Sequence, residues 1–180
     1  MSTSTIGTFT GLRVDPLALT VDDIDIEDIA HALSMQCRFG GHVSQFYSVA
    51  QHSVAVSQNV PPEDALWGLL HDATEAYLVD IPRPLKRSPV FAAYRDLEAQ
   101  LLTTIAKKFN LPPVLPASVH RADSIESFTE GAAFHHAYGS WWSSEDPDVQ
   151  PRGGAGCLVS QSPYRAKVAF LTRFMELTTR

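Results

Sequence analysis

Cysteine is scarce in this sequence, with only Cys37 and Cys157 among 180 residues. They form no Cys-x-x-Cys pair and are too few for a disulfide framework, so a reducing compartment suits the chain. Residues 1–10 have neither the basic start nor the apolar core of a secretion signal. No apolar run approaches the length that spans a bilayer. We therefore expect a cytoplasmic protein.

Basic residues are also few: the chain has 14 Lys and Arg against 20 Asp and Glu, which gives a formal net charge of −6. A nucleic-acid polymer needs a basic face, so it is excluded as the main partner, whereas a small anion in a locally positive pocket is not. The proportion of hydrophobic residues, 44%, is ordinary for a globular protein. The length predicts one domain over residues 1–180, with a mobile Ser/Thr-rich tail at 1–8.

Alternation of apolar and polar residues, the pattern of a half-buried strand, does not extend over four residues anywhere in the chain. Apolar residues instead recur at spacings of three and four. The sequence therefore predicts an all-α fold of about six helices, over residues 26–36, 46–56, 61–80, 90–109, 116–128 and 163–177. Residues 138–162, with Trp141 and Trp142, are expected to form a long irregular loop, which is more often a binding or oligomer surface than a passive connection.

Two adjacent polar residues, His71 and Asp72, interrupt the most apolar of these helices. They lie at the border of its buried stripe, and Glu75 follows one turn beyond His71 on the same face. Polar groups on an apolar helix cost free energy unless they are paired, and a divalent cation is a suitable partner. The alternative is a hydrogen-bonded core histidine beside a solvated carboxylate. For a His-Asp pair alone, that alternative is the more common case.

Two further polar residues, His52 and Asp123, lie on other predicted helices whose apolar stripes should face the same core. Together with His71 and Asp72 they offer two imidazoles and two carboxylates. Such a set leaves positions open on an octahedral cation, where water and a phosphate oxygen can bind.

The His…His-Asp…Asp order resembles that of the HD-domain metal-dependent phosphohydrolases, and the likeness extends over residues 9–128. It is greatest to small bacterial and phage enzymes that act on 2′-deoxynucleotides, namely 5′-deoxynucleotidases and dATP triphosphohydrolases. The matching segments are Arg38-Phe39, Ala50-Gln51-His52-Ser53 with Gln in place of the commoner Glu, the HD-x-x-E…D-x-P-x-P-x-K block at 71–86, and Ala122-Asp123.

The resemblance implies a single HD domain that holds a divalent metal ion (Co²⁺, Mn²⁺, Zn²⁺, Ni²⁺ or Mg²⁺) and directs a metal-activated water at a phosphate. The implied ligands are His52, His71, Asp72 and Asp123. Glu75 is the implied catalytic carboxylate, and Asp80 is expected close to the sugar or the attacking water.

Substrate contacts are implied as well. Arg38 and Lys86 are expected to hold phosphate oxygens, and Phe39 to crowd the sugar C2′ and reject a 2′-hydroxyl. Members of this family usually form dimers or larger rings, so a homo-oligomer is expected. The base stays open, because Gly40 and Gly41 leave room where a bulkier side chain could select one.

Several functions stay open at this stage. A dNTP triphosphohydrolase releases triphosphate from a dNTP, whereas a 5′-deoxynucleotidase releases phosphate from a monophosphate. Both need the same metal and differ in how they bind the phosphate groups. A catalytically silent, nucleotide-binding regulatory HD domain is an alternative, although such a module does not need the carboxylate of Glu75. A hydrolase of a non-nucleotide phosphoester or of a signalling nucleotide is another. The deoxynucleotide hydrolase is the function that the sequence favours.

Overall fold

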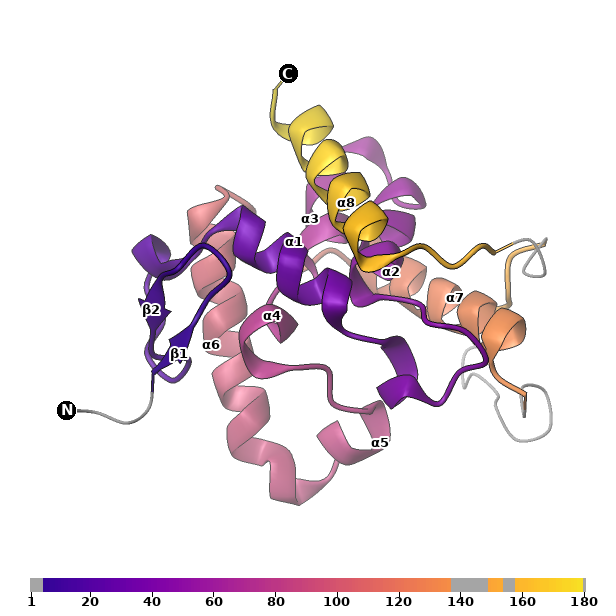
Figure 1. Cartoon of the computed structure of the whole chain (residues 1–180), viewed down its shortest axis with the longest axis horizontal. Helices are drawn as coiled ribbons and strands as arrows, with labels where there is room; N and C mark the ends of the chain where they lie inside the picture. The colour runs from indigo at the N-terminus through magenta and orange to yellow at the C-terminus, as the bar shows by residue number, and fades with distance from the viewer. Residues whose placement is uncertain (1–4, 137–148, 154–157, 180) are drawn as a thin grey trace.

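The computed structural model describes residues 5–136, 149–153 and 158–179, and this part of the chain is mostly helical, as predicted (Figure 1). Its strands are β1 (Ile6–Gly7) and β2 (Arg13–Val14), which pair antiparallel as a small hairpin. Residues 6 and 7 of the expected mobile tail thus take part in a hairpin. Of the described helices, none is both long and apolar enough to cross a membrane.

Helix α2 (Val49–Gln58) lies at the centre of the molecule and contacts α1 (Ile26–Met35), α3 (Ala65–Leu70), α7 (Ala117–Phe134) and α8 (Pro163–Thr178). It begins at residue 49 rather than 46, because the hydroxyl of Ser48 accepts a hydrogen bond from the backbone N–H of Gln51 and caps the helix. Its central position means that polar side chains on α2 are enclosed on several sides.

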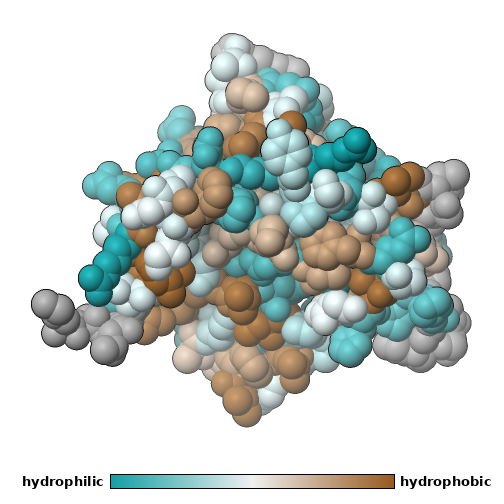
Figure 2. All heavy atoms as spheres, viewed as in Figure 1, coloured by the Kyte–Doolittle hydropathy of each residue, from teal (hydrophilic) through white to brown (hydrophobic). Residues whose placement is uncertain are grey.

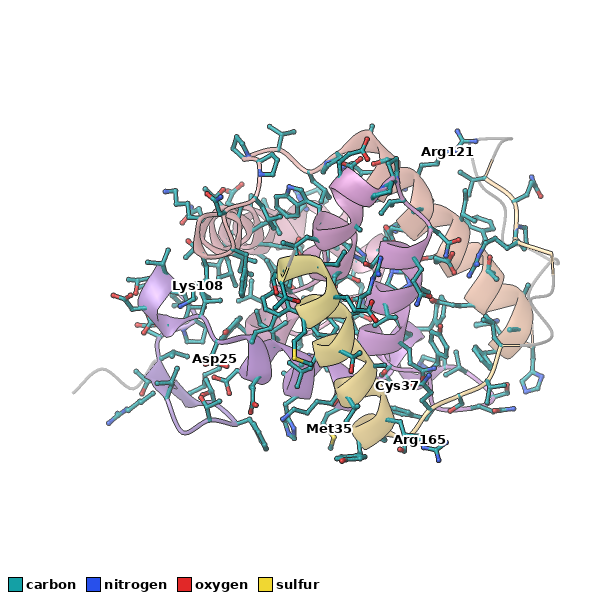
Figure 3. The ribbon with its side chains drawn as sticks, turned by 90° about the horizontal axis from the view of Figure 1, so that it is seen from above. Asp25, Met35, Cys37, Lys108, Arg121 and Arg165 are labelled. Atoms are coloured by element: carbon teal, nitrogen blue, oxygen red, sulfur yellow. The ribbon has the colours of Figure 1, made fainter. Side chains whose placement is uncertain are left out.

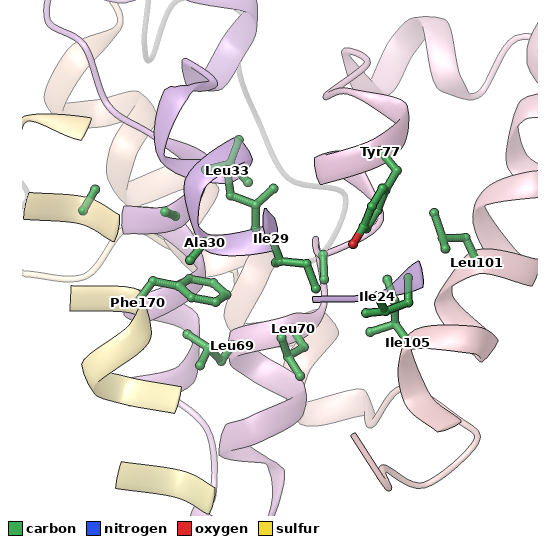
Figure 4. Close-up of a cluster of buried hydrophobic side chains, with 14 of the residues drawn as sticks. Ile24, Ile29, Ala30, Leu33, Leu69, Leu70, Tyr77, Leu101, Ile105 and Phe170 are labelled. Carbon is green, nitrogen blue, oxygen red and sulfur yellow. The ribbon is translucent and has the colours of Figure 1, made fainter. Parts of the chain in front are cut away.

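The main core contains residues of α1, α2, α3 and α8, together with Tyr77 of α4 (Glu75–Leu78) and Leu101 and Ile105 of α6 (Ala92–Lys108), and Figure 4 shows many of its side chains. Among its fully buried members are Ile29, Leu33, Leu69, Leu70 and Phe170. A second cluster surrounds Trp67 and joins α2 and α3 to α6 and α7. The two clusters fix the helices that carry the predicted ligands.

The helix predicted over residues 61–80 is not continuous. A 3-10 turn (Pro62–Asp64) leads into α3, residues 71–74 form turns, and α4 (Glu75–Leu78) follows. In the turn, backbone N–H groups bond to carbonyls three residues back, as from Ala73 to Leu70 and from Glu75 to Asp72. The ring of His71 explains the change. Its Nδ1 lies 2.8 Å from the carbonyl oxygen of Gly68, an acceptor that a continuous helix would use for the backbone N–H four residues later.

Other elements also differ from the prediction. The expected loop after Asp80 contains a one-turn helix, α5 (Arg83–Lys86), which tolerates Pro84 in its first turn. The remaining 3-10 turns are Val21–Asp23, Arg38–Gly41 and Pro89–Phe91. Exposed apolar residues near α5 and the start of α6 include Leu85 and Val90, where Figure 2 shows hydrophobic surface at the lower tip.

Helix α7 continues to Phe134, beyond the predicted end at 128. Most of the loop expected at 138–162 lies outside the described residues, including Trp141 and Trp142. Of its described part, Arg152 lies against α7, with Nη2 2.6 Å from Oε2 of Glu126.

Candidate metal centre

The ring of His52 is completely buried and oriented from α7. Its Nδ1 lies 2.7 Å from Oε1 of Glu130, a carboxylate oxygen that can only accept. Nδ1 therefore carries the hydrogen, and Nε2 faces two other carboxylates: Oδ1 of Asp123 at 3.1 Å and Oδ2 of Asp72 at 3.7 Å. A histidine fixed by a carboxylate through one nitrogen is typical of metal ligands.

The ring of His71 is arranged in the same way. A carbonyl oxygen can only accept, so the contact of Nδ1 with Gly68 places the hydrogen on Nδ1. Its Nε2 is buried and makes no hydrogen bond within the described residues, although Oδ2 of Asp72 lies 3.2 Å away. The two imidazole rings are 5.2 Å apart between centroids. Both Nε2 atoms thus approach one carboxylate, that of Asp72.

These atoms fit a divalent cation. One ligand atom each from His52, His71 and Asp72 lies within 4.8 Å of the others. Nε2 of His71 lies 3.2 Å from a carboxylate oxygen of Asp72 and makes no hydrogen bond within the described residues, an approach that a cation between the two atoms would favour. Two imidazole nitrogens and a carboxylate oxygen are suitable donors for Zn²⁺, Ni²⁺, Co²⁺ or Mn²⁺.

Asp123, on α7, is the fourth predicted ligand and reaches the group from one side. Its Oδ1 contacts His52, but its Oδ2 lies 3.1 Å from Nη2 of Arg83. Among the described residues, the ligand atoms that all lie within 4.8 Å of one another come from His52, His71 and Asp72, and Asp123 is not among them. The Arg83 side chain is 53% exposed, so this ion pair is screened by solvent and can be released at little cost.

The pKa values of His52 and Asp72 are both shifted in the direction that favours positive charge between the two side chains. Burial and Arg38 both lower the pKa of His52, but Glu130 and the hydrogen bonds with Asp123 and Glu130 outweigh them and raise it to about 10. Burial raises the pKa of Asp72, yet the adjacent histidines hold it well below its usual range. Because a histidine must be neutral at the nitrogen that binds a metal, a cation at Nε2 of His52 would compete with a proton for the same position.

Glu75, the predicted catalytic carboxylate, is 4% exposed and lies at the start of α4. Its Oε2 makes no hydrogen bond to any residue that the structure describes, and its Oε1 is 3.7 Å from Nζ of Lys86. Burial, followed by repulsion from Asp72 and Asp80, raises the pKa of Glu75 well above its usual value. The carboxylate form of Glu75 therefore has a greater affinity for a proton than an exposed glutamate has.

Gln36, at the end of α1, fixes the chain segment that carries both predicted catalytic residues. Its amide nitrogen donates to the carbonyl of Glu75 at 2.9 Å, and its amide oxygen accepts from the backbone N–H of Asp80 at 3.0 Å. Between them, Val79 has a φ of 62°, a left-handed conformation that is costly for a β-branched residue. Burial raises the pKa of Asp80, assisted by Asp72 and opposed by Arg38 and Lys86.

The predicted substrate residues lie around the same group. Arg38 is buried, with Nε 3.1 Å from Oε2 of Glu130, Nη2 2.9 Å from Oγ of Ser127 and Nη1 3.8 Å from Oδ2 of Asp72. Its guanidinium carbon lies 5.3 Å from the ring centre of Phe39, a residue with a φ of 57°. The positive φ at Phe39 is the kind of backbone strain found at functional sites.

Lys86, the other predicted phosphate contact, lies farther out. Its Nζ is 2.7 Å from Oε1 of Glu98 on α6, in addition to its contact with Glu75. The structure therefore brings Lys86 to Glu75 rather than to the three close ligand atoms.

Sequence reasoning missed several residues that position this site: Glu130, Gln36, Ser127, Arg83 and Glu98. Glu130 was detectable, because it follows Asp123 by seven residues and so lies on the same face two turns later. The helix was expected to end at residue 128, which left Glu130 outside it.

Two relatives extend over nearly the whole chain. The uncharacterized protein YfdR of Escherichia coli is 42% identical over 177 residues, which cover 97% of this chain and 96% of YfdR. The uncharacterized protein RCAP_rcc00048 of Rhodobacter capsulatus is 38% identical over 179 residues, which cover 91% of this chain and 90% of that protein. No protein-family model matches the chain.

Proposed function

The chain belongs to the same family as YfdR, and we propose that it is an HD-domain phosphohydrolase that cleaves 2′-deoxynucleotides with a divalent cation. The observation that carries the proposal is the pair of histidines whose Nδ1 atoms are already bonded to protein acceptors. Their Nε2 atoms face carboxylates: that of His71 faces Asp72, and that of His52 faces Asp123 and, farther away, Asp72. A buried arrangement of this kind is costly in a structural core and useful around a metal ion.

His52, His71 and Asp72 would hold the cation, with Asp123 joining them once Arg83 releases its second oxygen. When bound, the cation acts as a Lewis acid toward a phosphate oxygen and a water. Glu75 accepts a proton from the attacking water, because its pKa is raised and its Oε2 makes no hydrogen bond within the described part of the chain. Gln36 keeps this carboxylate in place by bonding to its backbone.

Arg38 and Phe39 select the substrate in this proposal. Arg38 contacts phosphate oxygens through the edge of its guanidinium nearest Asp72. Phe39 lies against the sugar, supported by its contact with the Arg38 guanidinium. A 2′-hydroxyl would clash with the ring or be buried without a partner.

The test is an assay of phosphate and triphosphate release from dNMPs, dNTPs and the matching ribonucleotides, with Co²⁺, Mn²⁺ and Mg²⁺. We expect deoxynucleotides to be cleaved about 10- to 100-fold faster than ribonucleotides. This ratio corresponds to the free energy of about 1–3 kcal/mol that burying one unpaired hydroxyl costs. Phe39→Ala should narrow that gap, whereas Arg38→Ala should weaken cleavage of both sugars alike.

Three outcomes would count against the proposal. Equal rates on ATP and dATP, and on AMP and dAMP, would remove Phe39 from its role. Full activity after metal stripping with excess chelator would exclude a metal-dependent hydrolase. Nucleotide binding without any cleavage would favour a regulatory HD domain.

A further inference from the structure

The ammonium of Lys86 lies between two carboxylates. Its Nζ is 2.7 Å from Oε1 of Glu98 on α6 and 3.7 Å from Oε1 of Glu75. The first distance is that of a hydrogen bond between charged groups, whereas the second is too long for a hydrogen bond. Lys86 therefore pairs directly with Glu98 and acts on Glu75 by its charge alone.

Helix α6 fixes both the side chain and the backbone of Lys86. Glu98 binds the ammonium, and the ring centre of Tyr94, one turn earlier on the same face, lies 5.8 Å from Nζ. Nη1 of Arg95 donates to the backbone carbonyls of Lys86 at 2.5 Å and of Ser88 at 2.9 Å. The Lys86 and Glu98 side chains are only 24% and 22% exposed, so their ion pair is less screened by water than a surface pair.

The same helix also reaches the segment that carries Glu75. The hydroxyl of Tyr94 donates to the carbonyl of Val79 at 2.8 Å. Val79 is the residue with a φ of 62° that follows α4, and α4 begins at Glu75. Helix α6 thus holds the segment that follows the proposed base and, through Glu98, the cation that approaches its Oε1.

The two carboxylate oxygens of Glu75 have different surroundings. Oε1 faces the ammonium of Lys86, whereas Oε2 is buried and makes no hydrogen bond within the described part of the chain. Oε2 is therefore the oxygen that is free to accept a proton. If the ammonium moved into direct contact with Glu75, its charge would stabilise the ionised carboxylate and lower its affinity for a proton. The ion pair with Glu98 opposes that movement.

We propose that Glu98 is a positioning residue, which keeps the ammonium of Lys86 out of direct contact with Glu75 and so leaves Oε2 of Glu75 to accept the proton of the attacking water. The inference rests on the proposed function. It gives Lys86 a role at the proposed base, in place of the phosphate contact that the resemblance implies. Because Glu98 acts through Lys86 and not on the substrate, its loss should affect kcat rather than KM.

The first test removes the carboxylate of Glu98. Glu98→Ala should lower kcat about tenfold, the lower end of the effect of one hydrogen bond to a charged group, because the ammonium then moves to Glu75. KM and metal affinity should stay at wild-type values. Glu98→Gln should lose less, since its amide oxygen still accepts from the ammonium. Steady-state kinetics on a deoxynucleotide and metal titration measure these effects.

The second test asks whether the effect depends on Lys86. Lys86→Met removes the ammonium, so Glu98→Ala should have no further effect on kcat in that background. A purely structural role of Glu98 would lower kcat equally in both backgrounds. Lys108→Met is the matched control, because Lys108 is an exposed cation at the far end of α6 (Figure 3). In the Lys108→Met background, Glu98→Ala should still lower kcat about tenfold.

Three outcomes would overturn the inference while cleavage by the wild-type protein still supports the proposed function. They are a wild-type kcat in Glu98→Ala, an equal loss with and without Lys86, and a rise in KM with unchanged kcat in Lys86→Met. The last result would make Lys86 a phosphate contact. If the wild-type protein cleaves no deoxynucleotide with any metal, the inference is overturned together with the proposed function.

Discussion

Glu130 uses both carboxylate oxygens to orient the site. One oxygen accepts from His52 and the other from Arg38, and the side chain is fully buried. A single residue thus orients both a proposed metal ligand, His52, and a proposed phosphate contact, Arg38. Because it touches neither metal nor substrate in this arrangement, it is a positioning residue.

Glu130→Gln should therefore lower metal affinity about 10- to 100-fold, the usual effect of losing a carboxylate behind a ligating histidine. An amide can accept from only one of the two donors and presents N–H groups to the other. Metal titration of the purified variant measures the loss, and circular dichroism reports whether the fold is kept.

Glu126→Gln is the matched control, because Glu126 is equally buried one turn earlier on α7 but pairs with Arg152. It should retain wild-type metal affinity. Equal affinities in both variants and the wild-type protein would show that Glu130 has only a structural role.

Glu75→Gln should lower the rate of cleavage without weakening the binding of metal or nucleotide. The substitution keeps the size of the side chain and removes the base, so metal and nucleotide binding should persist while the rate falls about 10²- to 10⁴-fold. Elemental analysis and single-turnover kinetics measure the two effects. Loss of the metal from this variant would instead make Glu75 a ligand.

At the scale of elements, the site depends on a close approach between α2 and α3. A Cβ added at Gly68 would lie 2.9 Å from Cα of Ser57 and 3.1 Å from its nitrogen. These are backbone atoms, so the helices would have to separate. Gly68 also supplies the carbonyl that orients His71, which connects the packing of α3 to the ring of that ligand.

Gly68→Ala should destabilise the fold by about 1–3 kcal/mol through overpacking, despite a gain of about 1 kcal/mol in helix propensity. It should also weaken metal binding, because His71 moves relative to His52. Chemical denaturation and metal titration measure both effects. Gly7→Ala, at an exposed position where an added Cβ meets nothing within 4 Å, is the control and should change neither. A Gly68→Ala protein as stable as wild type would contradict this account of the packing.

At the scale of the whole molecule, the proposed cation would join segments that are distant in the sequence: α2, the turn after α3, and α7 through Asp123. A ligand that binds only the native state stabilises it by about 2.7 kcal/mol at 100 times its Kd. For a chain of 180 residues this raises Tm by about 5–10 °C.

Thermal unfolding with and without metal should therefore differ for the wild-type protein. His71→Ala should abolish the difference, and His31→Ala should keep it, because His31 stacks on Phe9 at the outside of α1. Equal Tm values for the wild-type protein with metal and with chelator would contradict a metal centre at these residues.

The sequence by itself determined the helical class and the helices that carry His52 and Asp123, because apolar spacing records which face of a helix is buried. The helix predicted through His71 ends at Leu70 instead. It also indicated His52, His71 and Asp72 as neighbours, and their ligand atoms lie within 4.8 Å of one another. Periodicity indicated only that each residue lies beside a stripe that faces the core, and the resemblance to the HD-domain hydrolases singled these residues out as a set.

Only the tertiary structure decided how these residues are held and what surrounds them. The contacts of Glu130 with His52 and of Gln36 with the backbone of Asp80 join positions 78 and 44 residues apart, and no local pattern encodes such pairings. The turn at residues 71–74 depends on where the ring of His71 finds an acceptor. A cavity lined by Arg83, Lys86, Arg87, Arg95 and Asp123 likewise forms because α5 packs on α6, which brings together cations from separate segments. Contacts across large sequence separations follow from packing of whole helices, whereas residue spacing fixes only the face that each helix buries.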